Sequence, residues 1–223
     1  QVTIGAGAKF GFGAFQACAL LERVTMPEAG GVRFGVSCFS RDKNLRWIDL
    51  SKTDGVIADE AFYSCTALTV ANLTNVTKIG NFAFANCASL STLRMPVVEE
   101  IGQGAFARYK EGTYDEPMAP IIAELELPAT LRKVGEGAFV GLSQLKRVVL
   151  PESLTECGNY LFTQCVLLES VILPAGMTEI GEGMFMGCVL LEDVNLENIK
   201  TIGKYAFYEC ASLTGASLTA VQT

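Results

Sequence analysis

The stretch IGNFAFANCASLSTLRMP, from Ile79 to Pro96, returns in altered form along the whole chain. At its centre Phe84 follows an alanine and precedes Cys87 by three residues. Phenylalanine recurs at intervals of 22–24 residues, with one longer interval of 33. The recurring positions are Phe15, Phe39, Phe62, Phe84, Phe106, Phe139, Phe162, Phe185 and Phe207. A fixed period of this length is typical of repeat proteins, so we interpret the stretch as one of about nine copies.

Each copy combines a predicted strand with a predicted turn, in the frame I-G-x-x-A-F-x-x-C-x-x-L-x-x-V-x-L-P. The end of L-x-x-V-x-L alternates apolar and variable residues, which predicts a strand. The three-residue spacing in A-F-x-x-C places both side chains on one face of a short helical or 3₁₀ turn. One copy cannot bury its apolar face alone, so the copies are expected to stack and their strands to pair in parallel. The frame therefore predicts an α/β repeat solenoid.

The repeat covers residues 1–223 as a single domain, with an insertion at about residues 110–121 where the fifth copy departs from the frame. Val2 and Ile4 stand where the end of a preceding strand would lie. At the other end, residues 218–221 align with residues 73–76. Both ends thus fall inside a period, and we interpret the chain as a window from a longer array, or as one with poorly formed caps.

The composition favours a packed core and argues against several functions. Half of the 223 residues are hydrophobic and 18% are charged. The net charge of −7 argues against nucleic-acid partners and anionic membrane surfaces. Histidine, the commonest general base and metal ligand, is absent. No apolar run approaches the roughly 18 residues of a membrane span. We therefore expect no enzyme activity, catalytic residues, metal, cofactor or membrane insertion.

The frame resembles the BspA-like leucine-rich repeats of bacterial and protozoan surface proteins, and the resemblance covers nearly the whole chain. Membership implies a right-handed solenoid at the cell surface or secreted, with the parallel sheet on the concave side and short helical or 3₁₀ turns on the convex side. It implies adhesion or protein binding rather than catalysis. The chain departs from ordinary leucine-rich repeats because Val76, Val98 or Ile199 replaces the usual asparagine. An aliphatic ladder is expected in its place.

The eight cysteines and the G-x-G motifs follow the repeat. Cys18, Cys65, Cys87, Cys165, Cys188 and Cys210 share one slot, Cys38 takes an alanine slot and Cys157 an isoleucine slot. No C-x-x-C occurs, so we expect free, buried, inert thiols, although Cys65/Cys87 and Cys188/Cys210 are close enough in the frame to test as disulfides. The four G-x-G copies, which end at Gly13, Gly104, Gly137 and Gly183, are interpreted as turns rather than phosphate loops.

The outward positions of the predicted strands form the candidate partner-binding face. Tryptophan and arginine are typical anchors of protein interfaces, and Trp47 is the only tryptophan. The alternative is that Trp47 packs over its neighbours Arg23 and Val70, and that the outward acids, Glu124 and Glu126 among them, are solvated surface. The candidate contacts are Arg23, Trp47, Asp49, Val70, Asn72, Arg94, Glu124, Glu126, Arg147, Ile172 and Asp193.

The insertion is a second candidate, because loops on a rigid scaffold often carry recognition. It places Tyr109 and Tyr114 among prolines and charged residues. A loop tolerated without function is the alternative. The expected partner is a protein outside the cell, such as an extracellular-matrix or host-surface protein. A structural spacer that displays other modules and a glycan-binding module remain as alternatives.

Overall fold

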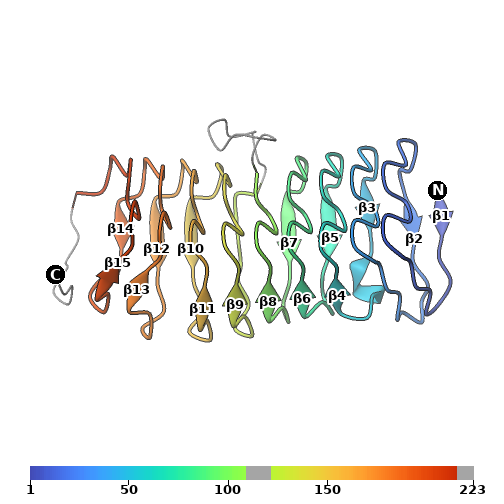
Figure 1. Cartoon of the computed structure of the whole chain (residues 1–223), viewed down its shortest axis with the longest axis horizontal. Helices are drawn as coiled ribbons and strands as arrows, with labels where there is room; N and C mark the ends of the chain where they lie inside the picture. Colours follow the sequence, from blue (N-terminus) through green and yellow to red (C-terminus); the bar gives the residue numbers. More distant parts are fainter. Residues whose placement is uncertain (109–121, 215–223) are drawn as a thin grey trace.

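In the computed structural model the chain forms a parallel β-solenoid of about eight turns, stacked in sequence order into an elongated ladder (Figure 1). The structure describes residues 1–108 and 122–214. The expected count of nine is not confirmed, because the strand of the last copy would lie at residues 215–217, outside that part. The stacked parallel turns confirm the solenoid predicted from the repeat.

The first sheet contains the strands predicted from L-x-x-V-x-L. All its pairings are parallel and join residues one period apart, such as Val70 with Thr92. An isolated bridge between Arg23 and Trp47 links the first pair of strands to the next. The strands are β1 (Val2–Thr3), β2 (Val24–Thr25), β3 (Trp47–Ile48), β5 (Val70–Asn72), β7 (Thr92–Arg94), β10 (Arg147–Val149), β12 (Ser170–Ile172) and β14 (Asp193–Val194).

A second parallel sheet, not expected from the sequence, lies along the lower row of Figure 1. Each of its strands is two residues long, typically one outward residue followed by one buried aliphatic residue. A glycine follows and begins the next A-F-x-x-C segment, which we call the arc. Its strands are β4 (Val56–Ile57), β6 (Lys78–Ile79), β8 (Glu100–Ile101), β9 (Lys133–Val134), β11 (Glu156–Cys157), β13 (Glu179–Ile180) and β15 (Thr201–Ile202).

The A-F-x-x-C arc does not form the expected helical turns. In one arc the N–H groups of Phe82, Phe84 and Asn86 donate to carbonyl groups of the next turn at 2.8, 2.8 and 2.9 Å. The Cys87 N–H donates back to the Phe84 carbonyl at 3.2 Å, which closes an i→i+3 turn. Positive φ angles at Phe82 (53°) and Asn86 (58°) prevent a helix from continuing. In the described residues the only helix is η1 (Leu50–Lys52), a single 3₁₀ turn outside the arcs.

The arcs are the most continuous part of the molecule. The same three interturn bonds recur at every junction between neighbouring arcs within the described residues. The G-x-G motifs fit this geometry: Gly104 is left-handed at φ 56°, and a Cβ on Gly102 would come within 2.6 Å of the Asn81 nitrogen in the preceding turn. The interpretation of these motifs as turns is therefore confirmed. Glycine is required there for two reasons, the left-handed backbone conformation and the close approach of the neighbouring turn.

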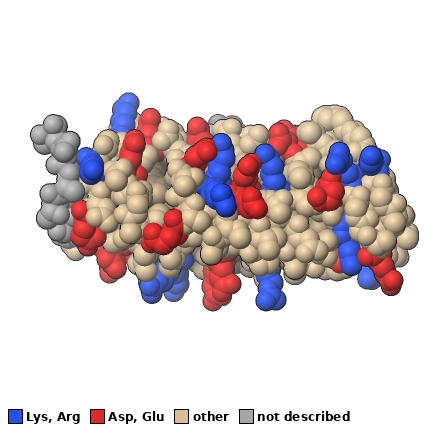
Figure 2. Space-filling model, turned by 90° about the horizontal axis from the view of Figure 1, so that it is seen from below, with Lys and Arg blue, Asp and Glu red and all other residues tan. Residues whose placement is uncertain are grey.

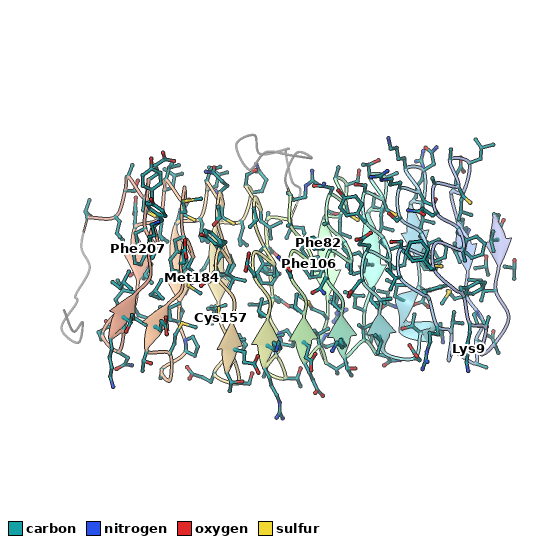
Figure 3. All side chains as sticks on the ribbon, in the orientation of Figure 1. Lys9, Phe82, Phe106, Cys157, Met184 and Phe207 are labelled. Atoms are coloured by element: carbon teal, nitrogen blue, oxygen red, sulfur yellow. The ribbon has the colours of Figure 1, made fainter. Side chains whose placement is uncertain are left out.

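The core is a column of stacked phenylalanines flanked by aliphatic side chains. Successive rings from Phe15 to Phe207 lie 5.2–6.0 Å apart, with interplanar angles of 2–22°. Figure 3 shows Phe106 and Phe207 among the side chains that fill the ladder. Val76, Val98 and Ile199 are buried, which confirms the aliphatic ladder expected in place of asparagine.

The first sheet is interrupted on both sides of residues 122–127, and the second sheet is interrupted between β11 and β13. In the first sheet, residues 122–127 form no strand, and no backbone hydrogen bond within the described residues joins them to β7 or β10. In the second sheet no ladder bond joins β11 to β13. There a hollow of about 530 Å³ is lined by Cys157, Met177 and Met184; Figure 3 labels Cys157 and Met184 on neighbouring turns. The arcs continue through these interruptions.

Candidate partner-binding face

The outward side chains of the first sheet lie in two columns, as the strand period predicts. β3 presents Trp47 outward, with 40% of its surface exposed, and buries Ile48 completely. The next strand repeats this arrangement with Val70 and Ala71. Every predicted contact in the described residues is exposed or half-buried. Tyr109 and Tyr114 lie outside the described residues.

The N-terminal end of this face holds an aromatic and cationic cluster. The guanidinium carbon of Arg23 lies 5.7 Å from the Trp47 ring centroid, within the range of a cation–π contact. Glu22 and Arg46 complete a shallow hollow of about 410 Å³ around this pair. Trp47 is thus both exposed and supported by Arg23, as in a preorganised contact residue.

A polar row follows the cluster along the second column. The Asn72 side-chain nitrogen donates to Asp49 Oδ1 at 2.9 Å, and Asn72 is in register with Arg94 on β7. Asp49 was expected to face outward on a strand, but it lies just after β3 and caps η1 through the Ser51 N–H at 3.1 Å. Its carboxylate therefore already serves the fold, whereas the exposed Arg94 is available to a partner.

The remaining predicted contacts lie beyond the interruption of the sheet and do not join this cluster. Arg147 and Ile172 lie on β10 and β12, and Asp193 on β14, where the sheet is continuous again. Glu124 and Glu126 are exposed as predicted, but they do not lie on a strand. The face is therefore two separate surfaces rather than one continuous column.

Three exposed residues were not among the predicted contacts. Glu22 and Arg46 precede the predicted outward position by one residue, and both are exposed together with the residue that follows them. Val149 is 48% exposed, more than any other aliphatic residue on these strands. The strand period alone could have indicated Val149, because it occupies the same column as Ile172.

All eight cysteines are free, so neither Cys65/Cys87 nor Cys188/Cys210 is a disulfide. Five of the thiols that share one slot of the repeat donate a hydrogen bond to the phenylalanine carbonyl of the preceding turn, at 3.0 Å for Cys65 and Phe39. They belong to Cys65, Cys87, Cys165, Cys188 and Cys210. Burial raises the pKa of Cys87 and Cys165 to about 12, which removes thiolate reactivity at neutral pH. Cys18, in contrast, is exposed, and Cys157 and Cys210 are half-buried, so the expectation that every thiol is buried is wrong for Cys18 and only partly met for the other two.

Charged side chains of both signs are interspersed along the edge viewed from below in Figure 2. Two ion pairs span adjacent strands of the second sheet, Lys78 with Glu100 at 2.7 Å and Lys133 with Glu156 at 2.6 Å. Pairing with Lys78 lowers the pKa of Glu100. The described residues hold no cluster of three or more metal-ligating side chains. They also contain no helix of the length and apolarity that crossing a bilayer requires.

Comparison with known proteins finds one family and several solved structures. The model of the family described as BspA type leucine rich repeat region matches residues 6–111 and 119–222, in six copies. No curated protein matches. A leucine rich cell surface protein from Faecalibacterium prausnitzii is 21% identical, with a TM-score of 0.51 over 96% of this chain and 79% of that one.

Two further solved structures are similar at comparable identity. The leucine rich repeat protein of T. pallidum is 24% identical, with a TM-score of 0.44 over 93% of this chain and 72% of that one. A leucine-rich repeat protein from Bacteroides ovatus is 21% identical, with a TM-score of 0.41 over 93% and 69%. Of the three, the Faecalibacterium structure is close enough to support the fold described above, and the likeness concerns the fold alone.

Proposed function

The chain belongs to the BspA-type leucine-rich repeat family, and from this premise we propose that it is a non-catalytic module that binds a protein partner through its first sheet. The observation that carries the proposal is the exposed Trp47 held under Arg23 beside a hollow. An exposed, preorganised aromatic side chain next to arginines is the composition of an interface anchor. The solved structure of a cell surface protein among the similar proteins supports a surface or secreted location. An extracellular-matrix or host-surface protein as the partner is a further part of the proposal.

The proposal is tested with the double substitution Trp47→Ala and Arg94→Ala in the purified chain. Both side chains are exposed, so the melting temperature should change little. Binding to immobilised extracellular-matrix proteins should weaken by about 30-fold or more, the effect of losing an interface anchor worth about 2 kcal/mol. The matched control is Tyr205→Ala, which removes an aromatic residue, 51% exposed, outside the first sheet. It should bind like the unaltered chain.

Two alternatives predict different results. A structural spacer would show no saturable binding of the purified chain, and the double substitution would then have nothing to weaken. A glycan-binding module would bind mucin and lose that binding when the mucin is enzymatically deglycosylated. Trp47 supplies one exposed aromatic face for a sugar, but the neighbouring Arg23 already covers part of it. Equal binding by the unaltered chain and the double variant would contradict the proposed site.

A further inference from the structure

We propose that the interruption of the first sheet is a separate binding site, which accepts an extended strand of a partner protein bearing an acidic residue followed two positions later by a basic one. The site lies between residues 122–127 and β10. The proposal deepens the proposed function, because it rests on protein binding at this sheet and names the partner's chemistry. It uses residues distant from Trp47, so the two sites can fail independently.

The first step concerns the backbone groups of β10. Ser170 and Glu169 on the far side donate to the Lys146 carbonyl, and the Leu150 N–H donates to the Ile172 carbonyl. Peptide groups in a strand alternate in direction, so those of the residues between, Arg147 and Val149, point toward the interruption. No ladder bond of the described residues joins them to residues 122–127. β10 therefore has an open edge, the template that strand addition uses.

The second step is the space beside that edge. A hollow of about 630 Å³ extends along it. One wall consists of residues 123–127 and the other of residues 146–149 and Pro151. The lining includes every residue of β10 and residues 123–127 opposite, the extent that an added strand would cover. Leu125 and Val148 are 7% and 1% exposed and close the core beneath it. The inward side chain of an added strand must therefore be small.

The third step is charge. Glu124 and Glu126 are exposed on one wall, and Lys146 and Arg147 on the other. No ion pair of the described residues spans the two walls, whereas neighbouring strands of the second sheet are joined by ion pairs at 2.7 and 2.6 Å. The four charges beside the hollow are therefore available to a ligand.

The order of those charges sets the ligand's polarity. At the start of β10, Lys146 and Arg147 outnumber Glu124, so this end favours an acidic residue. Two residues further along each wall the lining residues are Glu126 and the neutral Val149, so this end favours a basic residue. A strand added parallel to its neighbours would satisfy both with the core sequence acid, small residue, base.

The test uses the purified chain and a blocked synthetic peptide with the central sequence Asp-Ala-Lys flanked by serine and threonine. We expect saturable binding in a fluorescence anisotropy titration. A peptide with Asn and Gln in place of the charged residues should bind about tenfold more weakly. The double charge reversal Glu126→Lys with Arg147→Glu should weaken binding of the charged peptide by a similar factor. Glu192→Lys, an exposed reversal directly before β14 in the continuous part of the sheet, is the matched control and should not.

Hydrogen exchange gives a readout that does not depend on the choice of peptide. The amides of Arg147 and Val149 should exchange faster in the free chain than those of Ser170 and Ile172, which occupy the same ladder positions one turn later. Bound peptide should slow the Arg147 and Val149 amides. Slow exchange of both amides in the free chain, or equal binding of the charged and neutral peptides, would overturn the proposal. Either result leaves the Trp47 test of the proposed function unaffected.

Discussion

At the scale of single residues, Asp42 departs most from the repeat. It occupies the slot that cysteine fills in most other copies and is fully buried. Its Oδ1 accepts a hydrogen bond from the Cys18 N–H at 2.6 Å, while its Oδ2 has no hydrogen-bond partner. Burial raises the pKa of this carboxyl group from 3.8 to about 7, and the hydrogen bond offsets only part of the shift. The fold therefore favours the protonated acid.

This shift predicts a pH dependence with a definite sign. Between about pH 4 and pH 7 the unfolded chain loses the Asp42 proton while the folded chain keeps it, so the Asp42 contribution to stability falls as the pH rises. Asp42→Cys, which gives this copy the cysteine that both neighbouring copies carry, should raise the free energy of unfolding at pH 8 by up to about 4 kcal/mol, the equivalent of three pKa units. The gain should shrink toward pH 4. Urea denaturation at pH 8, 6 and 4 measures it.

The control for this prediction is Asp193→Asn, which neutralises an exposed carboxylate on β14. It should leave the pH dependence of stability close to that of the unaltered chain. If Asp42→Cys stabilises the chain equally at all three pH values, the gain comes from packing alone, and the account of Asp42 as a buried acid is wrong.

At the scale of elements, the sequence predicted the first sheet and mistook the arc. The alternation in L-x-x-V-x-L indicates a strand, and the strands lie where it indicates except at residues 122–127, which form none. The three-residue spacing of A-F-x-x-C is compatible with two backbone conformations. A helical turn and an i→i+3 turn that ends at a left-handed residue both place the same side chains inward. The second conformation needs left-handed residues, and some of these are Phe82 and Tyr160 rather than glycine. The sequence therefore gives no sign that the backbone is left-handed there.

A periodic sequence pattern also could not predict the second sheet or the interruption of the first sheet. The strands of the second sheet are two residues long, too short for a period to be recognised. The interruption at residues 122–127 follows the insertion, but a sequence cannot show whether an insertion leaves the ladder of the next strand intact. The outward positions of Trp47 and Ile172 were predictable, because they depend only on strand period.

Two glycines of one arc separate backbone conformation from close approach. Gly137 and Gly141 are both left-handed, with φ of 58° and 72°. A Cβ on Gly137 would meet a side-chain methyl at 3.2 Å, whereas one on Gly141 would lie 2.2 Å from the Arg108 carbonyl oxygen. Gly137→Ala should lower the free energy of unfolding by about 1–2 kcal/mol, the cost of the left-handed conformation. Gly141→Ala should lower it clearly further, because the neighbouring turn must move.

Urea denaturation of the two variants side by side measures the difference. Other arcs place Asn86 or Gln164 at the position equivalent to Gly141, with φ of 58° and 60°. A side chain is thus acceptable at this position when the preceding turn leaves room for its Cβ. Equal losses for the two alanine variants would mean that the contact with the Arg108 carbonyl relaxes freely and that conformation alone selects glycine here.

At the scale of the whole molecule, stability in a solenoid depends on contacts between neighbouring turns. Most junctions combine two sheet ladders, the three arc bonds and a stacked pair of phenylalanines. Residues 122–127 follow the Phe106 arc and pair with neither β7 nor β10, so the junctions on both sides of Phe106 lack the first-sheet ladder. The ring separation of 6.0 Å between Phe106 and Phe139 is among the largest in the column. The N-terminal and C-terminal halves of the chain therefore meet at one of the weaker junctions.

Phe106→Ala should separate the two halves energetically, whereas Phe62→Ala, at junctions where the first-sheet strands are paired, should not. Both rings are buried and stacked on both sides, so each substitution should lower the free energy of unfolding by about 3–5 kcal/mol. Trp47 fluorescence reports the N-terminal half and far-ultraviolet circular dichroism reports the whole chain. In urea the two probes should diverge for Phe106→Ala, because little coupling is left at the junctions beside it, and coincide for Phe62→Ala. Coincident transitions in both variants would show that the arc ladder and the second sheet alone keep the halves cooperative.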